Sequence, residues 1–166
     1  YEVYMMKNVK DEKLMALAKK KNVKVNIVAQ KSVLNNLVGN VVHQGIVAQV
    51  EGYDYYEIDE ILSSIPPHKQ PLLLMLDGLE DPHNLGAILR TCDSIEVDGV
   101  IIGKNRSVGL TPTVAKVSTG AIDYVKVAQV TNLSRTLEEL KKKGFWVVGC
   151  DLDESQDYRA VDYNMP

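Results

Sequence analysis

Residues 72–103 read LLLMLDGLEDPHNLGAILRTCDSIEVDGVIIG, and this stretch decides the fold of the chain. It opens with the apolar run Leu72–Leu76, which is too short for a helix that stands alone. Such a run predicts a strand buried on both faces, as in a parallel sheet. A helix is expected next, because apolar side chains recur at the spacing of one helical face, at Leu85, Ile88, Leu89 and Cys92. A second apolar strand is expected over Val97–Gly103.

A strand, a helix and a second strand in this order make a βαβ unit. In sheets built from such units, ligands bind beyond the carboxyl ends of the strands. The polar loop Asp77–Asn84 follows the first strand directly, so the sequence predicts the functional site there.

The same loop and helix carry Asn84, Gly86 and Arg90 at the spacing Asn-x-Gly-x3-Arg, within the longer run DPHNLGAILRT. This run resembles the first motif of the SpoU-type RNA ribose methyltransferases of the SPOUT (trefoil-knot) superfamily, and within it the ribosomal RNA guanosine-2′-O group. The resemblance implies transfer of a methyl group from S-adenosylmethionine to a ribose 2′-hydroxyl of ribosomal or transfer RNA. It gives Asn84 the role of organising the active-site loop and Arg90 a role on the target ribose. The alternatives are that Asn84 only caps the helix and that Arg90 is only a solvated side chain.

A second resemblance lies in His43-Gln44-Gly45-Ile46-Val47-Ala48. This run is similar to the stretch that closes the N-terminal RNA-binding domain of many SpoU-type enzymes. Gly45 would let the backbone approach RNA closely, and His43 and Gln44 could donate to phosphate or base edges. A polar turn that enters a strand is the alternative. The pattern of residues 1–50 predicts a small βαβαβ domain.

Charge is spread unevenly along the chain, whose formal net charge is −3. Residues 1–31 hold eight lysines against three acids, a balance of +5, whereas residues 51–62 hold five acids and no base. The basic segment could face RNA phosphates. The alternative for the cluster Lys19–Lys21 is a solvated helix end, where cations suit the helix dipole.

Residues 53–70 are predicted to be a linker between two domains, residues 1–52 and residues 71–166. This segment is acidic, and it ends in Pro66-Pro67-His68-Lys69-Gln70-Pro71, where three prolines in six residues oppose regular pairing. Its tyrosines, Tyr53, Tyr55 and Tyr56, could stack on bases or pack the linker onto its domain.

Lys104 and Arg106 follow the second predicted strand, on the same rim as the Asn84 loop. That placement favours phosphate contacts, with a plain solvated loop as the alternative. Further along, the pattern predicts a helix that Thr111 caps, a third strand over Tyr124–Val130, a helix that Asn132 caps and a fourth strand over Phe145–Gly149.

Several other functions are disfavoured. The chain has no run of about 20 apolar residues, no signal segment, no GxGxxG or GxxxxGK(S/T) loop, and no metal-ligand spacing among its three histidines and two cysteines. The expectations are therefore no membrane, no metal, reduced thiols and a cytoplasmic location.

The resemblance further implies features beyond Pro166. Members of the family continue with a Gly-rich second motif and a Ser-Leu-Asn third motif, which thread the knot and form most of the S-adenosylmethionine pocket. The fold class predicted is therefore α/β, with a small N-terminal α/β RNA-binding domain, incomplete at its start, and an incomplete SPOUT domain (an α/β knot on a Rossmann-like parallel sheet) that lacks its knot-forming part. A homodimer is implied for the full-length protein. The chain alone is expected to be inactive, and an RNA-binding module without catalysis is the alternative.

Overall fold

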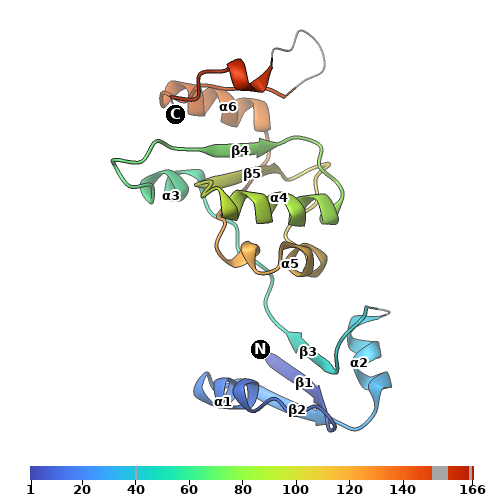
Figure 1. Cartoon of the computed structure of the whole chain (residues 1–166). Helices are drawn as coiled ribbons and strands as arrows, with labels where there is room; N and C mark the ends of the chain where they lie inside the picture. The colour runs from blue at the N-terminus through green and yellow to red at the C-terminus, as the bar shows by residue number, and fades with distance from the viewer. Residues whose placement is uncertain (40, 151–156, 165) are drawn as a thin grey trace. The chain divides into compact units, whose positions relative to one another are not determined.

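A computed structural model describes residues 1–39, 41–150, 157–164 and 166 (Figure 1). The chain divides into two compact units, Tyr1–Gly52 and Tyr53–Pro166. Each unit is an α/β structure with its own sheet. No helix among these described residues is long and apolar enough to cross a membrane.

The first unit is built on a three-stranded sheet in the order β2-β1-β3. The central strand pairs in parallel with β2 and antiparallel with β3, so that Val3 lies opposite both Val25 and Ala48. The elements are β1 (Glu2–Met6), α1 (Glu12–Lys20), β2 (Lys24–Val28), α2 (Lys31–Val38) and β3 (Ile46–Gln49). This order confirms the predicted βαβαβ pattern. Its core consists of Val3, Met5, Ala18, Leu34 and Val47.

The second unit has an all-parallel sheet in the order β4-β5-β6. Its strands are β4 (Leu73–Leu76), β5 (Gly99–Gly103) and β6 (Val127–Val130). Its helices are α3 (Ile58–Ser63), α4 (Pro82–Ser94), α5 (Pro112–Ser118) and α6 (Leu133–Lys142), with short 3-10 helices at Ala121–Asp123 and Tyr158–Ala160.

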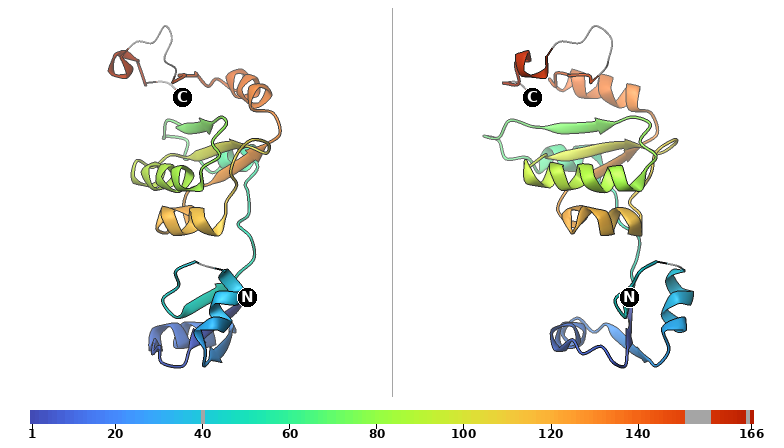
Figure 2. Two further views of the ribbon diagram at one scale, coloured as in Figure 1. Left: turned by 90° about the vertical axis from the view of Figure 1, so that its right-hand side faces the viewer. Right: turned by 45° about the vertical axis from the view of Figure 1, so that its right-hand side comes forward.

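Helices cover both faces of this sheet, which gives three layers (Figure 2). Val100 and Ile102 point from β5 toward α4 and α5, while Ile101 between them points toward α3 and α6. This alternation is what a fully buried strand requires. Burial on the α4 side also raises the pKa of the Cys92 thiol, and Cys92 and Cys150 are both free.

Two strand predictions need correction. The run Leu72–Leu76 was expected to be buried on both faces, but β4 is only partly buried, because it pairs with β5 alone among the described residues. The strand with neighbours on both sides is β5, and all five of its residues are buried. The third strand is also shorter than expected, because it begins at Val127 and not at Tyr124. Tyr124 directly follows the 3-10 helix Ala121–Asp123, and its side chain is exposed.

The predicted fourth strand over Phe145–Gly149 has no regular strand structure. Phe145 packs against the core on the α6 side, but Trp146, Val147 and Val148 are exposed. No strand among the described residues pairs with them, and one of their backbone contacts runs from Trp146 N to Pro166 O at 2.6 Å. Residues 145–149 are apolar enough to form a strand, but no described strand lies beside them to pair with.

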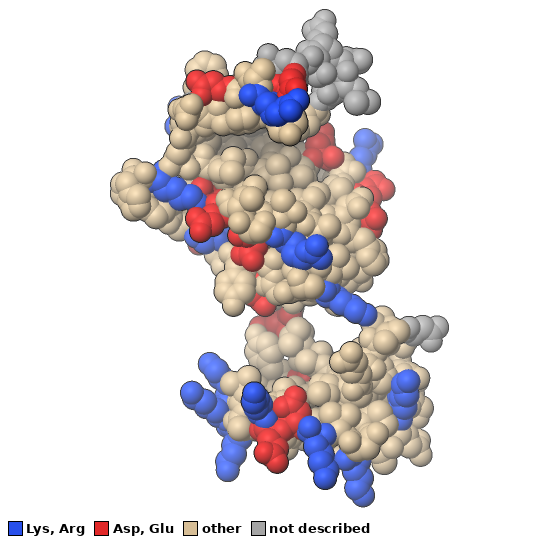
Figure 3. Space-filling view, in the orientation of Figure 1, with Lys and Arg blue, Asp and Glu red and all other residues tan. Residues whose placement is uncertain are grey.

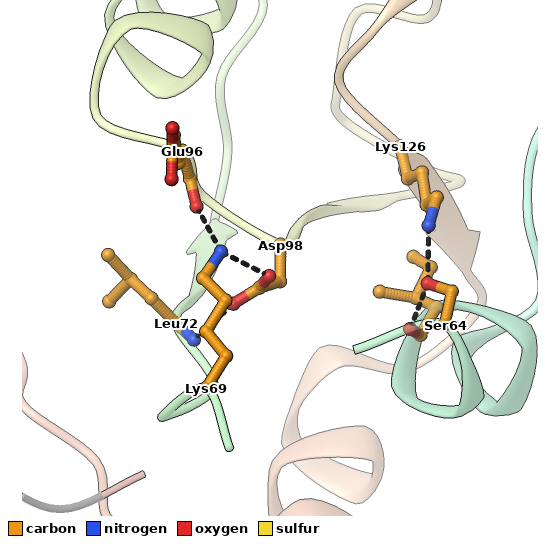
Figure 4. Close-up of polar contacts among 7 residues, drawn as sticks. Ser64, Lys69, Leu72, Glu96, Asp98 and Lys126 are labelled. Carbon is orange, nitrogen blue, oxygen red and sulfur yellow. Dashed lines mark hydrogen bonds and ion pairs between the residues drawn. The ribbon is translucent and has the colours of Figure 1, made fainter. Parts of the chain in front are cut away.

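The segment expected as a linker, residues 53–70, belongs to the second unit. Ile61 of α3 is only 1% exposed and lies in the core beneath Ile101 and Leu140. Lys126 Nζ donates to Ser64 Oγ at the end of this helix, and Lys69 lies against residues 96–98 (Figure 4). Side-chain contacts therefore attach the proline-rich stretch to the second unit.

Candidate functional site

The carboxyl ends of the three parallel strands meet at one edge of the second unit, where two loops lie side by side. The loop after β4 (residues 77–81) and the loop after β5 (residues 104–110) are joined by a hydrogen bond from Val108 N to Leu79 O at 2.8 Å. We call these two loops together with Asn84 the rim. The rim lies where ligands bind to parallel sheets, as the sequence predicted.

Asn84 lies in the first turn of α4, but it does not cap the helix. Asp81 is the N-cap, since its side chain accepts a hydrogen bond from His83 N at 2.8 Å, and Pro82 occupies the first helical position. The capping alternative for Asn84 is therefore wrong. The Asn84 side chain is exposed and makes no hydrogen bond within the described parts of the chain. Its amide can donate to and accept from a ligand at the rim.

Arg90 lies further along the same helix, six residues after Asn84. That spacing corresponds to about 9 Å along the helix axis and about 120° around it. Arg90 is exposed and makes neither an ion pair nor a hydrogen bond in the portion of the chain that the structure describes. The guanidinium is thus unsatisfied by the protein, but it does not converge with Asn84 on one point.

Gly86, the middle residue of the motif, has a packing role. It is buried against α5, and a Cβ at this position would lie 2.7 Å from Val117 Cβ and 3.1 Å from Ser118 N. The motif therefore combines one residue that allows close contact between helices with two exposed polar residues.

Lys104 and Arg106 are both exposed in the loop after β5, as predicted. Arg106 adopts a left-handed backbone conformation with φ of 53°. The hydroxyl of the adjacent Ser107 is enclosed and lacks a hydrogen-bond partner among the described residues. The loop thus presents two cations at the rim and encloses one hydroxyl without a partner among the described residues.

In the first unit, the ring of His43 is occupied by contacts within the protein. Its Nδ1 accepts from Gly45 N at 3.2 Å, so the other ring nitrogen, Nε2, carries the proton and donates to Asn35 Oδ1 at 2.8 Å. Gly45 has φ of 87°, and a Cβ there would lie 2.7 Å from Val9 Cγ2. These contacts give His43 and Gly45 structural roles in the turn that enters β3. Gln44 alone of the three is exposed.

The lysines of the first unit lie on its surface, and Figure 3 shows them projecting from it. Lys19, Lys20 and Lys21 at the end of α1 are exposed and form no ion pair with any described residue. Lys24 instead pairs with Glu2 at 3.0 Å. Hydrogen bonds from Tyr4, Lys24 and Asn26 hold the pKa of the Glu2 carboxyl below its usual value.

Two cavities of the second unit lie away from the rim. One, of about 500 Å³, lies between α3, β6 and α6, and it is lined by Tyr56, Gln129 and Thr136 among others. The other, of about 400 Å³, is apolar and lies beside β4 and α4. Neither is lined by Asn84, Lys104 or Arg106. These two cavities are thus separate from the rim residues. No cluster of acidic, His or Cys side chains among the described residues could hold a metal ion.

Comparison with known proteins connects both units to one family. Residues 71–166 match the SpoU rRNA Methylase family, and residues 1–56 match the family described as RNA 2′-O ribose methyltransferase substrate binding. The chain belongs to the SpoU rRNA Methylase family. Among relatives of this SpoU chain, YacO of Bacillus subtilis (strain 168), named for the TrmH family of tRNA/rRNA methyltransferases, is 46% identical over 170 residues. That alignment covers 100% of the chain and 68% of YacO.

Other relatives agree with this assignment. A TrmH family protein of Staphylococcus aureus (strain COL) is 48% identical over 163 residues, which cover 97% of the SpoU chain and 61% of the relative. An AdoMet-bound rRNA methyltransferase from Sinorhizobium meliloti has the same fold, with a TM-score of 0.69 and 22% identity over 98% of this chain and 58% of that one. AviRb from Streptomyces viridochromogenes gives a TM-score of 0.62 at 20% identity, over 86% of this chain and 52% of its own. The SpoU chain thus spans between about half and two thirds of these proteins.

Two features of the site were not found from the sequence. One is the packing role of Gly86, for which a glycine inside an amphipathic helix was a usable signal. The other is the partner of Tyr55, whose hydroxyl contacts the loop after β5; packing of Tyr55 onto its domain was one alternative, but the sequence did not indicate this contact.

Proposed function

We propose that the protein containing this chain methylates a ribose 2′-hydroxyl of RNA with S-adenosylmethionine as the methyl donor. The observation that carries the proposal is the pairing of two matches in one chain, a 2′-O ribose substrate-binding unit followed by a SpoU methylase unit. A guanosine of large-subunit ribosomal RNA is the proposed target, because the His43–Ala48 stretch resembles the end of the RNA-binding domain of many SpoU-type enzymes, and such a domain favours large-subunit ribosomal RNA over transfer RNA. A ribose of transfer RNA is the second candidate.

In this proposal the two units divide the work. The exposed lysines of the first unit bind phosphates and hold the RNA, and the exposed Gln44 can also contact it. At the rim, Lys104 and Arg106 bind the phosphates that flank the target nucleotide, while Asn84 orients the loop and the ribose. The exposed Arg90 fixes the ribose or its phosphate through the two-pronged geometry of a guanidinium.

S-adenosylmethionine supplies the methyl group when bound. Neither cavity described above is lined by the rim residues, and the relatives are longer than this chain, so we infer that the pocket for S-adenosylmethionine requires residues beyond those present here. The 166-residue chain is accordingly expected to bind S-adenosylmethionine weakly or not at all in isothermal calorimetry. A micromolar dissociation constant would contradict this inference, because it would mean that the residues present are sufficient.

A homodimer through the second unit, a cytoplasmic location and the absence of a resident metal complete the proposal. Ribosomal and transfer RNAs are cytoplasmic substrates in bacteria, the source of the relatives. Mass measurement by light scattering on a protein of the relatives' full length would test the dimer.

The function itself is tested with a protein of that full length and S-adenosylmethionine labelled in its methyl group. Ribosomal and transfer RNA transcripts are offered separately. Label that survives alkaline hydrolysis in a dinucleotide identifies a 2′-O-methylated ribose, since a methylated ribose blocks cleavage of the next bond. Label in a mononucleotide would contradict the 2′-O assignment. RNA binding without methylation would favour a different function, that of a catalytically inactive RNA-binding module.

A further inference from the structure

The segment that opens the second unit runs against the rim. Tyr53 packs at the edge of the core formed by α4, α5 and β5, and burial raises the pKa of its phenol. Tyr56 N donates to Val127 O of β6 at 2.9 Å. Between them, Tyr55 Oη accepts a hydrogen bond from Leu110 N at 2.8 Å, at the end of the loop after β5. Residues 53–57 are thus fastened to the same body as the rim.

The contact between Tyr55 and the loop depends on Gly109. A Cβ at this position would lie 2.6 Å from Tyr55 Oη but 3.9 Å from Tyr55 Cζ. Gly109 does not have a positive φ. The requirement for glycine is therefore space for one oxygen atom, and backbone conformation plays no part in it.

The loop is held at three points. Lys104 N donates to Val130 O at 2.8 Å, Val108 N donates to Leu79 O at 2.8 Å, and Leu110 N donates to Tyr55 Oη at 2.8 Å. The first two contacts join backbone to backbone. Of these three contacts, only the third uses a side chain, the Tyr55 hydroxyl. Arg106 lies between the first and second points, with its side chain exposed. The third point, at Leu110, fixes the end of the same loop.

We propose that Tyr55 is a positioning residue for RNA binding, whose hydroxyl oxygen holds the loop that presents Lys104 and Arg106 to the RNA backbone. The proposal rests on the proposed function, in which these two cations bind phosphate. In the described structure the hydroxyl accepts from Leu110 N and has no acceptor for its own proton. Replacement of Tyr55 by phenylalanine therefore removes the contact and keeps the ring.

The first test compares Tyr55→Phe with Tyr56→Phe by amide hydrogen exchange and by RNA affinity. Tyr56 is an adjacent, exposed tyrosine whose hydroxyl makes no hydrogen bond with a described residue, which makes it a matched control. Tyr55→Phe is expected to speed exchange of the Leu110 amide and to weaken binding of an RNA hairpin by about threefold to tenfold, the loss that one neutral hydrogen bond predicts. Tyr56→Phe should change neither. Exchange of the β5 amides reports that the fold is retained.

The second test uses Gly109→Ala in two backgrounds. With Tyr55 present, the new methyl group meets the hydroxyl oxygen and should displace the loop, weakening RNA binding by more than Tyr55→Phe does. With Tyr55→Phe the oxygen is absent, and Gly109→Ala should cost little further affinity. Independent, additive effects of the two substitutions would overturn the proposal. When Gly109→Ala is combined with Tyr56→Phe, it should weaken RNA binding as much as it does in the wild-type background.

Failure of this proposal and of the proposed function can be told apart. If the wild-type protein binds no RNA, the proposed function fails, whereas Leu110 exchange still measures the Tyr55 contact. If RNA binds and Tyr55→Phe changes the exchange but not the affinity, the positioning role is overturned. If Tyr55→Phe retains affinity and Tyr55→Leu loses it, the ring stacks on a base and the hydroxyl is irrelevant, which also overturns the proposal.

Discussion

Lys69 Nζ lies 2.6 Å from Asp98 Oδ1, and this ion pair fastens the proline-rich segment to the start of β5 (Figure 4). The same ammonium donates to Glu96 O at 2.8 Å. The other carboxylate oxygen of Asp98 accepts from Leu72 N at 2.8 Å. The Asp98 side chain is 8% exposed and that of Lys69 is 32% exposed, so the pair is better shielded from water than the other ion pairs described here.

Loss of the Asp98 carboxylate should destabilise the second unit. Asp98→Ala leaves Leu72 N without its acceptor and leaves the Lys69 ammonium with Glu96 O alone, and we expect a loss of about 2 kcal/mol in the free energy of unfolding. Lys69→Met should cost less, about 1 kcal/mol, because Lys69 is partly solvated. Urea unfolding measures both. Arg135→Met is the control, since Arg135 is 79% exposed in its pair with Glu139, and an equal effect there would contradict the importance of shielding.

Gly86→Ala should also destabilise the second unit. Alanine favours a helix over glycine by about 1 kcal/mol, but the added methyl group would press on Val117 Cβ at 2.7 Å. A β-carbon cannot swing aside, so α4 and α5 must separate, and overpacking of this kind costs about 1–3 kcal/mol. We expect a net loss in thermal unfolding. Gly52→Ala, at a site with nothing within 4 Å of the new methyl group, is the control. A Gly86→Ala variant as stable as this control would refute the packing role.

The helices and strands that could be predicted were those with strong local periodicity. The α4 stripe follows from residue spacing alone, and Leu85, Leu89 and Cys92 are buried as that spacing predicts. The capping residue was also within reach, because proline prefers the first helical position and Pro82 therefore indicates Asp81 as the cap. The position of Pro82 therefore argued against Asn84 as the N-cap of α4.

What could not be predicted depends on partners distant in the sequence. Whether an apolar run is a central strand, as in β5, or an edge, as in β4, depends on which strands lie beside it. Exposed Trp146 belongs to a run with strand-like composition and no described strand beside it. The contact of Tyr55 with Leu110 spans 55 residues, and no local pattern encodes it.

The lysine cluster of α1 offers a direct test of RNA binding by the first unit. Replacing Lys19, Lys20 and Lys21 together by glutamine should weaken RNA binding and lower its salt dependence, by about 2–3 in the slope of log K against log salt for duplex RNA. Titrations at several salt concentrations measure this slope.

A matched control exists at the end of α6, where Lys141, Lys142 and Lys143 also complete a helix. Two of these pair with acids, Lys141 with Glu138 and Lys143 with Asp59, each at 3.0 Å. Both clusters suit a helix dipole equally, but only the α1 cluster is free of ion pairs with described residues. Equal effects of the two triple substitutions on the salt slope would show that the α1 lysines only complete their helix.

The last prediction concerns Arg90 in a protein of the relatives' full length. Methyl transfer to a ribose hydroxyl requires an aligned oxygen and removal of its proton. A guanidinium keeps its proton in proteins and is therefore a poor base, and Arg90 is an exposed side chain. We therefore expect Arg90 to position the ribose or its phosphate and not to act as the base.

Arg90→Ala should then lower the methylation rate by roughly a hundredfold or more. Arg90→Lys should restore part of the rate, because lysine keeps the positive charge but lacks the two-pronged geometry of the guanidinium. Arg135→Ala on α6 should leave the rate unchanged. In a positional role the pH–rate profile keeps its shape in Arg90→Lys, because no proton passes through the side chain. If that variant instead gains a titration near the pKa of lysine, and its rate follows this titration, Arg90 accepts the proton and the positional role is wrong.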